Sequence, residues 1–299
     1  MFETILVPTD GSDGAAAAVA VGRAMSSRLD ASLHGVAVVD DPELPDHARE
    51  AIDDHRLEEA RSHASALASA SEGDVETAVL HTGAAVHETI IAYADEIGAD
   101  CIVMGTAGRT GVRRLAFGSV AERTVRAAPF PVVVVPPTAT ADPIDEILVP
   151  VDGSDGAQSA VDHAVEIAES FAAGLHLLHV VDVSAFGLAA GMEDLYAGLE
   201  RVGEAALEEA QSSADEGDVR KIEASLTSGG VDRAIREYVD DRDIDLLVMG
   251  THGRSGMERF WLGSTTERVI RRSSVPVLAV KPPAIIDRLS IPDVTYAER

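Results

Sequence analysis

The sequence predicts two three-layer α/β/α domains, each built on a five-stranded parallel sheet. Two observations lead to this α/β fold class. The 299 residues suffice for two domains of roughly 150 residues, and the first half of the chain recurs in the second. Within each half, short apolar runs alternate with longer stretches of helical periodicity, which is typical of strands joined by right-handed helical crossovers. Such strands form a parallel sheet whose two faces are covered by helices.

The repeat predicts the domain boundaries. Three segments recur in the same order: 5–14 at 147–156, 103–106 at 248–251, and 131–135 at 276–280. The offset grows from 142 to 145 residues, which predicts a three-residue insertion in the second copy, near 184–191. We expect a first domain at 1–137, a proline-rich linker at 138–143, a second domain at 144–283, and a tail at 284–299 that has no counterpart in the first copy.

The individual elements follow from the same patterns. Apolar runs of the first copy predict strands at 4–7, 32–39, 75–80, 101–104 and 131–135. Apolar residues at helical spacing predict a helix after the third strand of each copy: Val86, Ile90, Ala94 and Ile97, then Val231, Ile235 and Val239. Open α/β sheets bind ligands at the carboxyl ends of their strands, so we expect a site at that edge.

Composition excludes several classes of protein. The net charge is −27, with 51 Asp+Glu against 24 Lys+Arg, and this repels nucleic acid. A carboxylate-rich surface is typical of proteins that stay soluble in concentrated salt, so we expect a halophilic, cytoplasmic protein. The chain has neither an apolar run of membrane-spanning length nor a signal-peptide pattern at its N-terminus. The single cysteine, Cys101, enters an apolar run and is expected to be a buried structural thiol.

A glycine-rich loop follows the fourth strand of each copy. In the first copy Gly105 and Gly108 are followed after nine residues by Gly118 and Ser119, and the second copy repeats this spacing with Gly250, Gly253, Gly263 and Ser264. Glycines let backbone N–H groups approach a phosphate. We expect Ser119 and Ser264 to cap the helices that follow, whose N-termini favour anions. A structural turn remains the alternative, because duplication copies structural and functional turns alike.

Charge supports the anion interpretation. Ten of the 24 cations lie in two short stretches beside these loops: Arg109, Arg113, Arg114, Arg123 and Arg126, then Arg254, Arg259, Arg268, Arg271 and Arg272. Such local positive charge in an otherwise acidic chain suits a polyphosphate.

These motifs resemble the universal stress protein family over residues 1–283, as a tandem of two domains of its ATP-binding branch. The resemblance rests on ILVPxDGS at the start of each copy, VMGTxGR at the fourth strand, and GSxxER before the final strand. It implies an adenine nucleotide alpha hydrolase-like fold with strand order 3-2-1-4-5 in each domain. It also implies a role in stress response or signalling, with ATP as the ligand.

The resemblance implies roles for individual residues. The nucleoside would contact Pro8, Thr9, Asp10, Val38 and Gly105, and in the second copy Pro150, Val151, Asp152, Val180 and Gly250. The phosphates would contact Gly108, Arg109, Gly118, Ser119 and Val120, and in the second copy Gly253, Arg254, Gly263, Ser264 and Thr265. Mg²⁺ or Mn²⁺ would bind through the phosphates and take no protein ligands. The two loops differ at Ala107 and His252, which makes the two sites unequal if His252 reaches a phosphate or metal.

Catalysis is expected to be weak. The chain has no Walker lysine, and neither Lys221 nor Lys281 is expected near a glycine loop. Asp13 and Asp155 could position a water, but acids at this place more simply favour the dipole of a helix N-terminus. We expect slow ATP hydrolysis at most. A slow ATPase and a protein-interaction scaffold without nucleotide remain the alternatives.

Other candidate residues have simpler interpretations. His47, His55 and His63 are expected on a solvated helix face, and His176 and His179 are expected to be structural. Phe260 and Trp261 could cover a ligand or form an interface.

The final strand of each copy would leave an exposed sheet edge. In the family this edge pairs with another domain, so we expect the two halves to form an internal pseudo-dimer. Whether two chains pair further, and which protein partner they meet, stays open.

Overall fold

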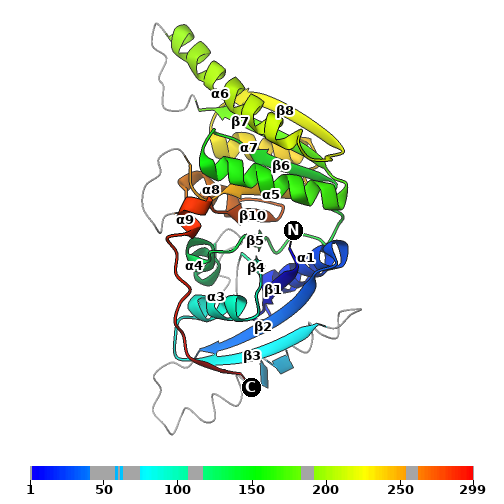
Figure 1. Ribbon diagram of the computed structural model, residues 1–299, viewed down its shortest axis with the longest axis vertical. Coiled ribbons are helices and arrows are strands. Elements are labelled where there is room, and N and C mark those ends of the chain that lie inside the picture. The colour runs from blue at the N-terminus through cyan, green and yellow to red at the C-terminus, as the bar shows by residue number, and fades with distance from the viewer. Residues whose placement is uncertain are drawn as a thin grey trace. The chain divides into compact units, whose positions relative to one another are not determined.

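The computed structural model describes residues 2–40, 58–59, 61–62, 75–106, 117–182, 192–253 and 262–298. The chain divides into two compact units (Figure 1). The first unit comprises Phe2–Asp142 together with Arg288–Arg299, and the second comprises Pro143–Asp287. The expected insertion near 184–191 and the three histidines His47, His55 and His63 lie outside the described residues.

The first unit contains the predicted parallel sheet. Its strands are β1 (Thr4–Pro8), β2 (Ser32–Asp40), β3 (Glu76–Thr82), β4 (Cys101–Gly105) and β5 (Val132–Val135). They lie in the order β3-β2-β1-β4-β5, and every neighbouring pair among them is parallel. The described helices are α1 (Asp13–Leu29), α3 (Val86–Glu96) and α4 (Ser119–Ala127).

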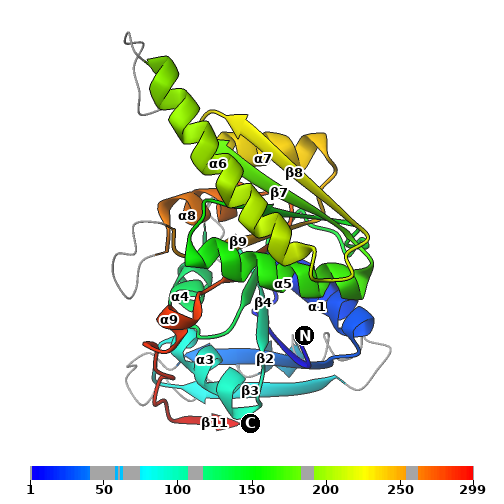
Figure 2. The same ribbon diagram turned by 45° about the horizontal axis from the view of Figure 1, so that its top comes forward.

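The second unit repeats this topology. Its strands are β6 (Glu146–Pro150), β7 (Gly174–Val181), β8 (Lys221–Ser228), β9 (Leu246–Gly250) and β10 (Val277–Val280), in the order β8-β7-β6-β9-β10. Its helices are α5 (Asp155–Phe171), α6 (Met192–Ala214), α7 (Val231–Asp241), α8 (Ser264–Ile270) and α9 (Pro283–Ile286). Helices α5 and α6 pack together on one face, and α7 and α8 pack together on the other (Figure 2). The predicted fold class and strand order are therefore confirmed in both units.

The core consists of the central strands. All four residues of β5 are fully buried, as are the middle residues of β1 and β6, because strands covered on both faces carry continuous apolar runs. Cys101 lies in this core, and burial raises the pKa of its thiol far above the usual range. The expectation of a structural thiol is confirmed. Among the described residues, no helix has the length and apolar character needed to cross a bilayer.

Serine side chains set the start of the first helix in each unit. The Ser12 hydroxyl accepts a hydrogen bond from Ala15 N, and the Ser154 hydroxyl accepts one from Ala157 N, which are N-cap contacts. Asp13 follows in the first turn of α1, where its charge favours the helix dipole. The helix-start interpretation of this acid is confirmed.

The C-terminal tail adds a sixth strand to the first unit's sheet. Strand β11 (Tyr296–Glu298) pairs antiparallel with β3, with Tyr296 opposite Thr82. The Tyr296 ring lies edge-on to Tyr93, with centroids 6.3 Å apart, and its hydroxyl donates a hydrogen bond to Glu96. The repeat could not predict this strand, because the tail has no counterpart in the first copy. It covers part of an otherwise unpaired sheet edge.

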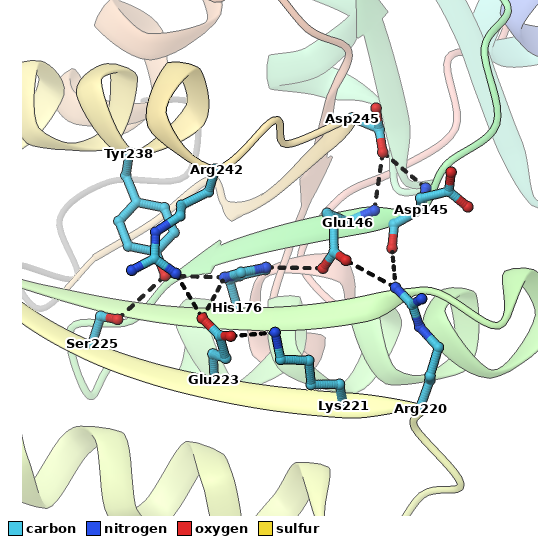
Figure 3. Close-up of polar contacts among 10 residues, drawn as sticks. All are labelled: Asp145, Glu146, His176, Arg220, Lys221, Glu223, Ser225, Tyr238, Arg242 and Asp245. Atoms are coloured by element: carbon cyan, nitrogen blue, oxygen red, sulfur yellow. Dashed lines mark hydrogen bonds and ion pairs between the residues drawn. The ribbon is translucent and has the colours of Figure 1, made fainter.

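A polar network surrounds the buried His176 at the amino end of the second unit's sheet (Figure 3). His176 Nε2 lies 2.9 Å from Glu146 Oε2, and Nδ1 lies 3.0 Å from the Tyr238 hydroxyl. Two arginines hold the flanking carboxylates: Arg220 donates to Glu146 at 2.9 Å, and Arg242 donates to Glu223 at 2.7 Å. These bonds satisfy a buried imidazole, which confirms that His176 is structural.

In both units an aspartate accepts backbone hydrogen bonds from the start of the first strand. Asp245 accepts hydrogen bonds from Asp145 N at 2.8 Å and Glu146 N at 2.9 Å, and Asp100 accepts one from Glu3 N at 2.8 Å. Burial is the main cause that raises the pKa of Asp245.

Replacing His176 by leucine is expected to destabilise the chain more than the same change at His34, its counterpart in the first unit. His34 Nδ1 has no hydrogen-bond partner among the described residues and lies 3.6 Å from Glu76. We expect His176→Leu to lower the free energy of unfolding by about 2 kcal/mol, because Glu146 and Tyr238 each lose a partner. His34→Leu should cost less than about 1 kcal/mol. Urea unfolding followed by circular dichroism measures both, and equal losses would contradict the assigned role of the network.

Candidate functional site

The candidate site lies at the carboxyl ends of the central strands. Strand order reverses between β1 and β4 in the first unit and between β6 and β9 in the second, and ligands of open α/β sheets bind at such a switch. At this edge several strand residues are half-buried, although the residues directly before them are buried: Pro8, Val38 and Gly105, then Pro150, Val180 and Gly250. These are residues that the sequence predicted for the nucleoside.

A tight turn after the first strand holds the predicted acid. Asp10 Oδ1 accepts hydrogen bonds from Ser12 N at 3.1 Å and from Ser12 Oγ at 2.6 Å. Gly11 between them has φ 77°, a left-handed conformation that favours glycine. Thr9 N donates to Val36 O at 2.8 Å, which ties the turn to β2. Ser12 thus links the acid to the N-terminus of α1.

The second unit reproduces this turn. Asp152 Oδ1 accepts hydrogen bonds from Ser154 N at 3.0 Å and Ser154 Oγ at 2.6 Å, and Gly153 has φ 76°. Val151 N donates to Leu178 O at 2.9 Å. His179 is also structural, as expected, because its Nδ1 lies 2.8 Å from Val151 O.

Two glycines allow the fourth strand to touch the first helix. A Cβ built on Gly105 would lie 2.5 Å from the carbonyl carbon of Gly14, and a Cβ built on Gly250 would lie 2.5 Å from that of Gly156. Real Cβ atoms do not approach backbone so closely, so both strand positions require glycine. Gly14 and Gly156 were not predicted as site residues from the sequence. The signal was present, because both close the repeated Asp-Gly-Ser-Asp-Gly motif.

Backbone hydrogen bonds bring the two ends of each glycine loop together. Gly118 N donates to Thr106 O at 2.6 Å, and Gly263 N donates to Thr251 O at 2.7 Å. Gly253 lies close to the predicted acid of its unit, since a Cβ built there would be 3.0 Å from Asp152 Oδ2. The predicted residues Gly108, Arg109 and Arg254 lie outside the described residues, as do Phe260 and Trp261.

The predicted serine caps after the loops are wrong. Ser119 and Ser264 are the first residues of α4 and α8, and the caps are Gly118 and Gly263, without a side-chain cap bond. The cap position lies against the end of the preceding strand, where a side chain has little room. A Cβ on Gly263 would lie 3.1 Å from Thr251 O. The two serines are exposed, and the residues after them, Val120 and Thr265, are half-buried.

The expectation that no lysine lies near a glycine loop is wrong for Lys281. Lys281 follows β10, whose last residue Val280 pairs with Gly250 at the start of the loop. Its side chain is 5% exposed, and burial lowers its pKa to about 7. His252 in the loop has a lowered pKa as well, caused first by burial and then by the charge of Lys281.

Substituting Gly250 by alanine is expected to lower the thermal unfolding midpoint. The new methyl would collide with the Gly156 backbone, at a cost of about 1–3 kcal/mol for overpacking. Gly198→Ala in α6 is the matched control, because nothing lies within 4 Å of the Cβ position and alanine favours helix by about 0.5–1 kcal/mol. Circular dichroism during heating compares the two. A Gly250→Ala variant as stable as the control would show that the contact tolerates a side chain.

The chain is similar to known proteins of one family. The profile of the universal stress protein family matches residues 1–136 and 143–281. Universal stress protein MJ0531 of Methanocaldococcus jannaschii is 42% identical over 141 residues, which are 46% of this chain and 82% of that protein. Universal stress protein Slr1230 of Synechocystis is 31% identical over 185 residues, which are 61% of this chain and 58% of that protein.

A solved structure shows the same fold over nearly the whole chain. The crystal structure of a universal stress protein from Archaeoglobus fulgidus covers 93% of this chain and 96% of its own, with a TM-score of 0.65 and 22% identity. The repeat, the strand order and the two family matches lead to one conclusion: the chain belongs to the universal stress protein family and contains its domain twice in tandem.

Proposed function

We propose that the chain binds ATP at both strand-end sites and serves as a stress-response or signalling module. The single observation that carries this proposal is the repeated construction of the two sites. Each has an acid fixed by a serine, a glycine-to-glycine contact and a loop whose ends are tied together. Family membership supports the stress-response part of the proposal.

The nucleoside would occupy the turn side of each site. Asp10 and Asp152 present carboxylates at the strand end, and a carboxylate has room for several donors, including ribose hydroxyls. The partly exposed Pro8 and Val38 supply an apolar wall for adenine in the first unit, and Pro150 and Val180 supply it in the second.

The phosphates would occupy the glycine-loop side. In the first unit, α4 begins at Ser119, and the N–H groups of its first turn have no acceptor within the helix. Such a terminus attracts phosphate. Gly108, Gly253 and the loop arginines Arg109 and Arg254 belong to the same proposal. Mg²⁺ or Mn²⁺ would be held through phosphate oxygens and water.

Calorimetric titration with ATP and magnesium tests the proposal. We expect two equivalents to bind the intact chain and one to bind each of Gly118→Val and Gly263→Val. The reason is clearest at Gly263, where even a Cβ would crowd Thr251 O. Gly83→Val is the control, because its Cβ position has nothing within 4 Å. No binding to the folded intact chain would leave a protein-interaction scaffold, and rapid magnesium-dependent turnover would instead favour an ATPase.

We also propose that the chain works in a salt-rich cytoplasm, where its net charge of −27 is screened. Raising KCl from about 0.1 M to about 2 M should raise the thermal unfolding midpoint by several degrees, because it weakens repulsion between carboxylates. Choline chloride at equal ionic strength should act similarly if screening is the cause. A midpoint that falls or stays constant in both salts would contradict this proposal.

The pairing of the two halves and of whole chains stays a prediction.

A further inference from the structure

A histidine and a lysine distinguish the second unit's site from the first. His252 stands where the first unit has Ala107, and Lys281 stands where it has Pro136, at the same 145-residue offset. Both differences fall at the base of the glycine loop, just after two neighbouring strands, β9 and β10. The repeat therefore provides an internal reference in which both groups are missing.

The sheet holds the two residues close to each other. Strands β9 and β10 are parallel neighbours with Gly250 opposite Val280, so the chain leaves both strands at the same level. Thr251 N donates to Val280 O at 2.8 Å, which fixes the residues before His252 and Lys281 together. The charge of Lys281 reaches His252, since it lowers the pKa of that imidazole.

Both side chains are placed at an energetic cost. Lys281 is 5% exposed, and burial of an ammonium disfavours its charged form. His252 Nδ1 lies 2.9 Å from Thr251 Oγ1, while Nε2 is buried and has no hydrogen-bond partner among the described residues. Buried polar atoms nearly always have a hydrogen-bond partner. A phosphate oxygen would satisfy Nε2 and stabilise the ammonium.

A carboxylate also lies at the loop base. Asp152 lies next to Gly253, and Gly253 is the residue that follows His252 in the chain. Its Oδ1 already accepts two hydrogen bonds from Ser154. The Asp152 turn has a counterpart at Asp10, whereas the His252 and Lys281 pair has none. The pair is therefore an addition to the shared site.

We infer that His252 and Lys281 form a phosphate-binding subsite that only the second unit possesses, and that it makes the second site bind ATP more tightly than the first. This inference rests on the proposed nucleotide function. The shared chemistry is a phosphate group, which ATP or inorganic phosphate could supply. The two sites then differ in their contacts to phosphate and remain alike in their contacts to adenosine.

The test isolates the second site with Gly118→Val and measures ATP, adenosine and inorganic phosphate by calorimetry. A pH of about 6 keeps most of the Lys281 side chains protonated, because it lies about one unit below the lowered pKa of about 7. Lys281→Met and His252→Ala should each weaken ATP binding, by about tenfold or more for Lys281→Met, and leave adenosine binding within about twofold. Lys281→Arg keeps the charge and should retain most of the ATP affinity.

Two controls separate a phosphate contact from a structural effect. Lys221→Met removes the only other lysine, which lies at the start of β8. It should leave the affinities for ATP, adenosine and inorganic phosphate unchanged. In the Gly263→Val background only the first site remains, and Lys281→Met should leave its ATP affinity unchanged. Equal loss of ATP and adenosine binding, or no loss at all, would overturn the subsite.

Failure of the proposed function gives a different result. The intact chain could bind inorganic phosphate but no nucleotide. If Lys281→Met then abolishes phosphate binding and Lys221→Met does not, the subsite is supported and the nucleotide function is rejected. Absence of both nucleotide and phosphate binding would reject both.

Discussion

The close approach of a strand end to a helix N-terminus is the contact on which each site depends. Gly105 meets Gly14 and Gly250 meets Gly156 with no space for a side chain between them. This contact places the turn that holds the acid beside the loop that starts at the fourth strand. If Gly105 or Gly250 carried a Cβ, the helix would have to move away from the sheet. One steric constraint therefore positions both halves of each site.

The sequence predicted the fold well because the fold depends on patterns that a chain displays openly. Buried parallel strands read as apolar runs, and the duplication marked equivalent positions in both halves. The loop spacing indicated the candidate site at the strand ends. Residues whose role depends on contact between distant segments were missed. Gly14 pairs with a strand about ninety positions away, and Lys281 meets His252 only through the register of two strands.

The wrong helix caps show a second limit. Serine before a helix normally accepts a backbone hydrogen bond, as Ser12 and Ser154 do. Ser119 is instead the first residue inside its helix, because the hydrogen bond from Gly118 N to Thr106 O makes Gly118 the cap. Composition at a helix start therefore predicts a cap only when no tertiary contact fixes the register. Strand β11 was missed for a related reason, since three residues without a repeat partner carry no periodicity.

Strand β11 makes the first unit's sheet discontinuous along the chain. Five of its strands end by Val135, but the sixth is the segment Tyr296–Glu298, which follows the whole second unit. During synthesis the outer edge of the first unit's sheet therefore stays incomplete until the segment Tyr296–Glu298, which follows the second unit, has been made. Until then β3 presents unpaired backbone groups to the nascent chain and its neighbours. The first unit's sheet is therefore completed only after the second unit has been synthesised.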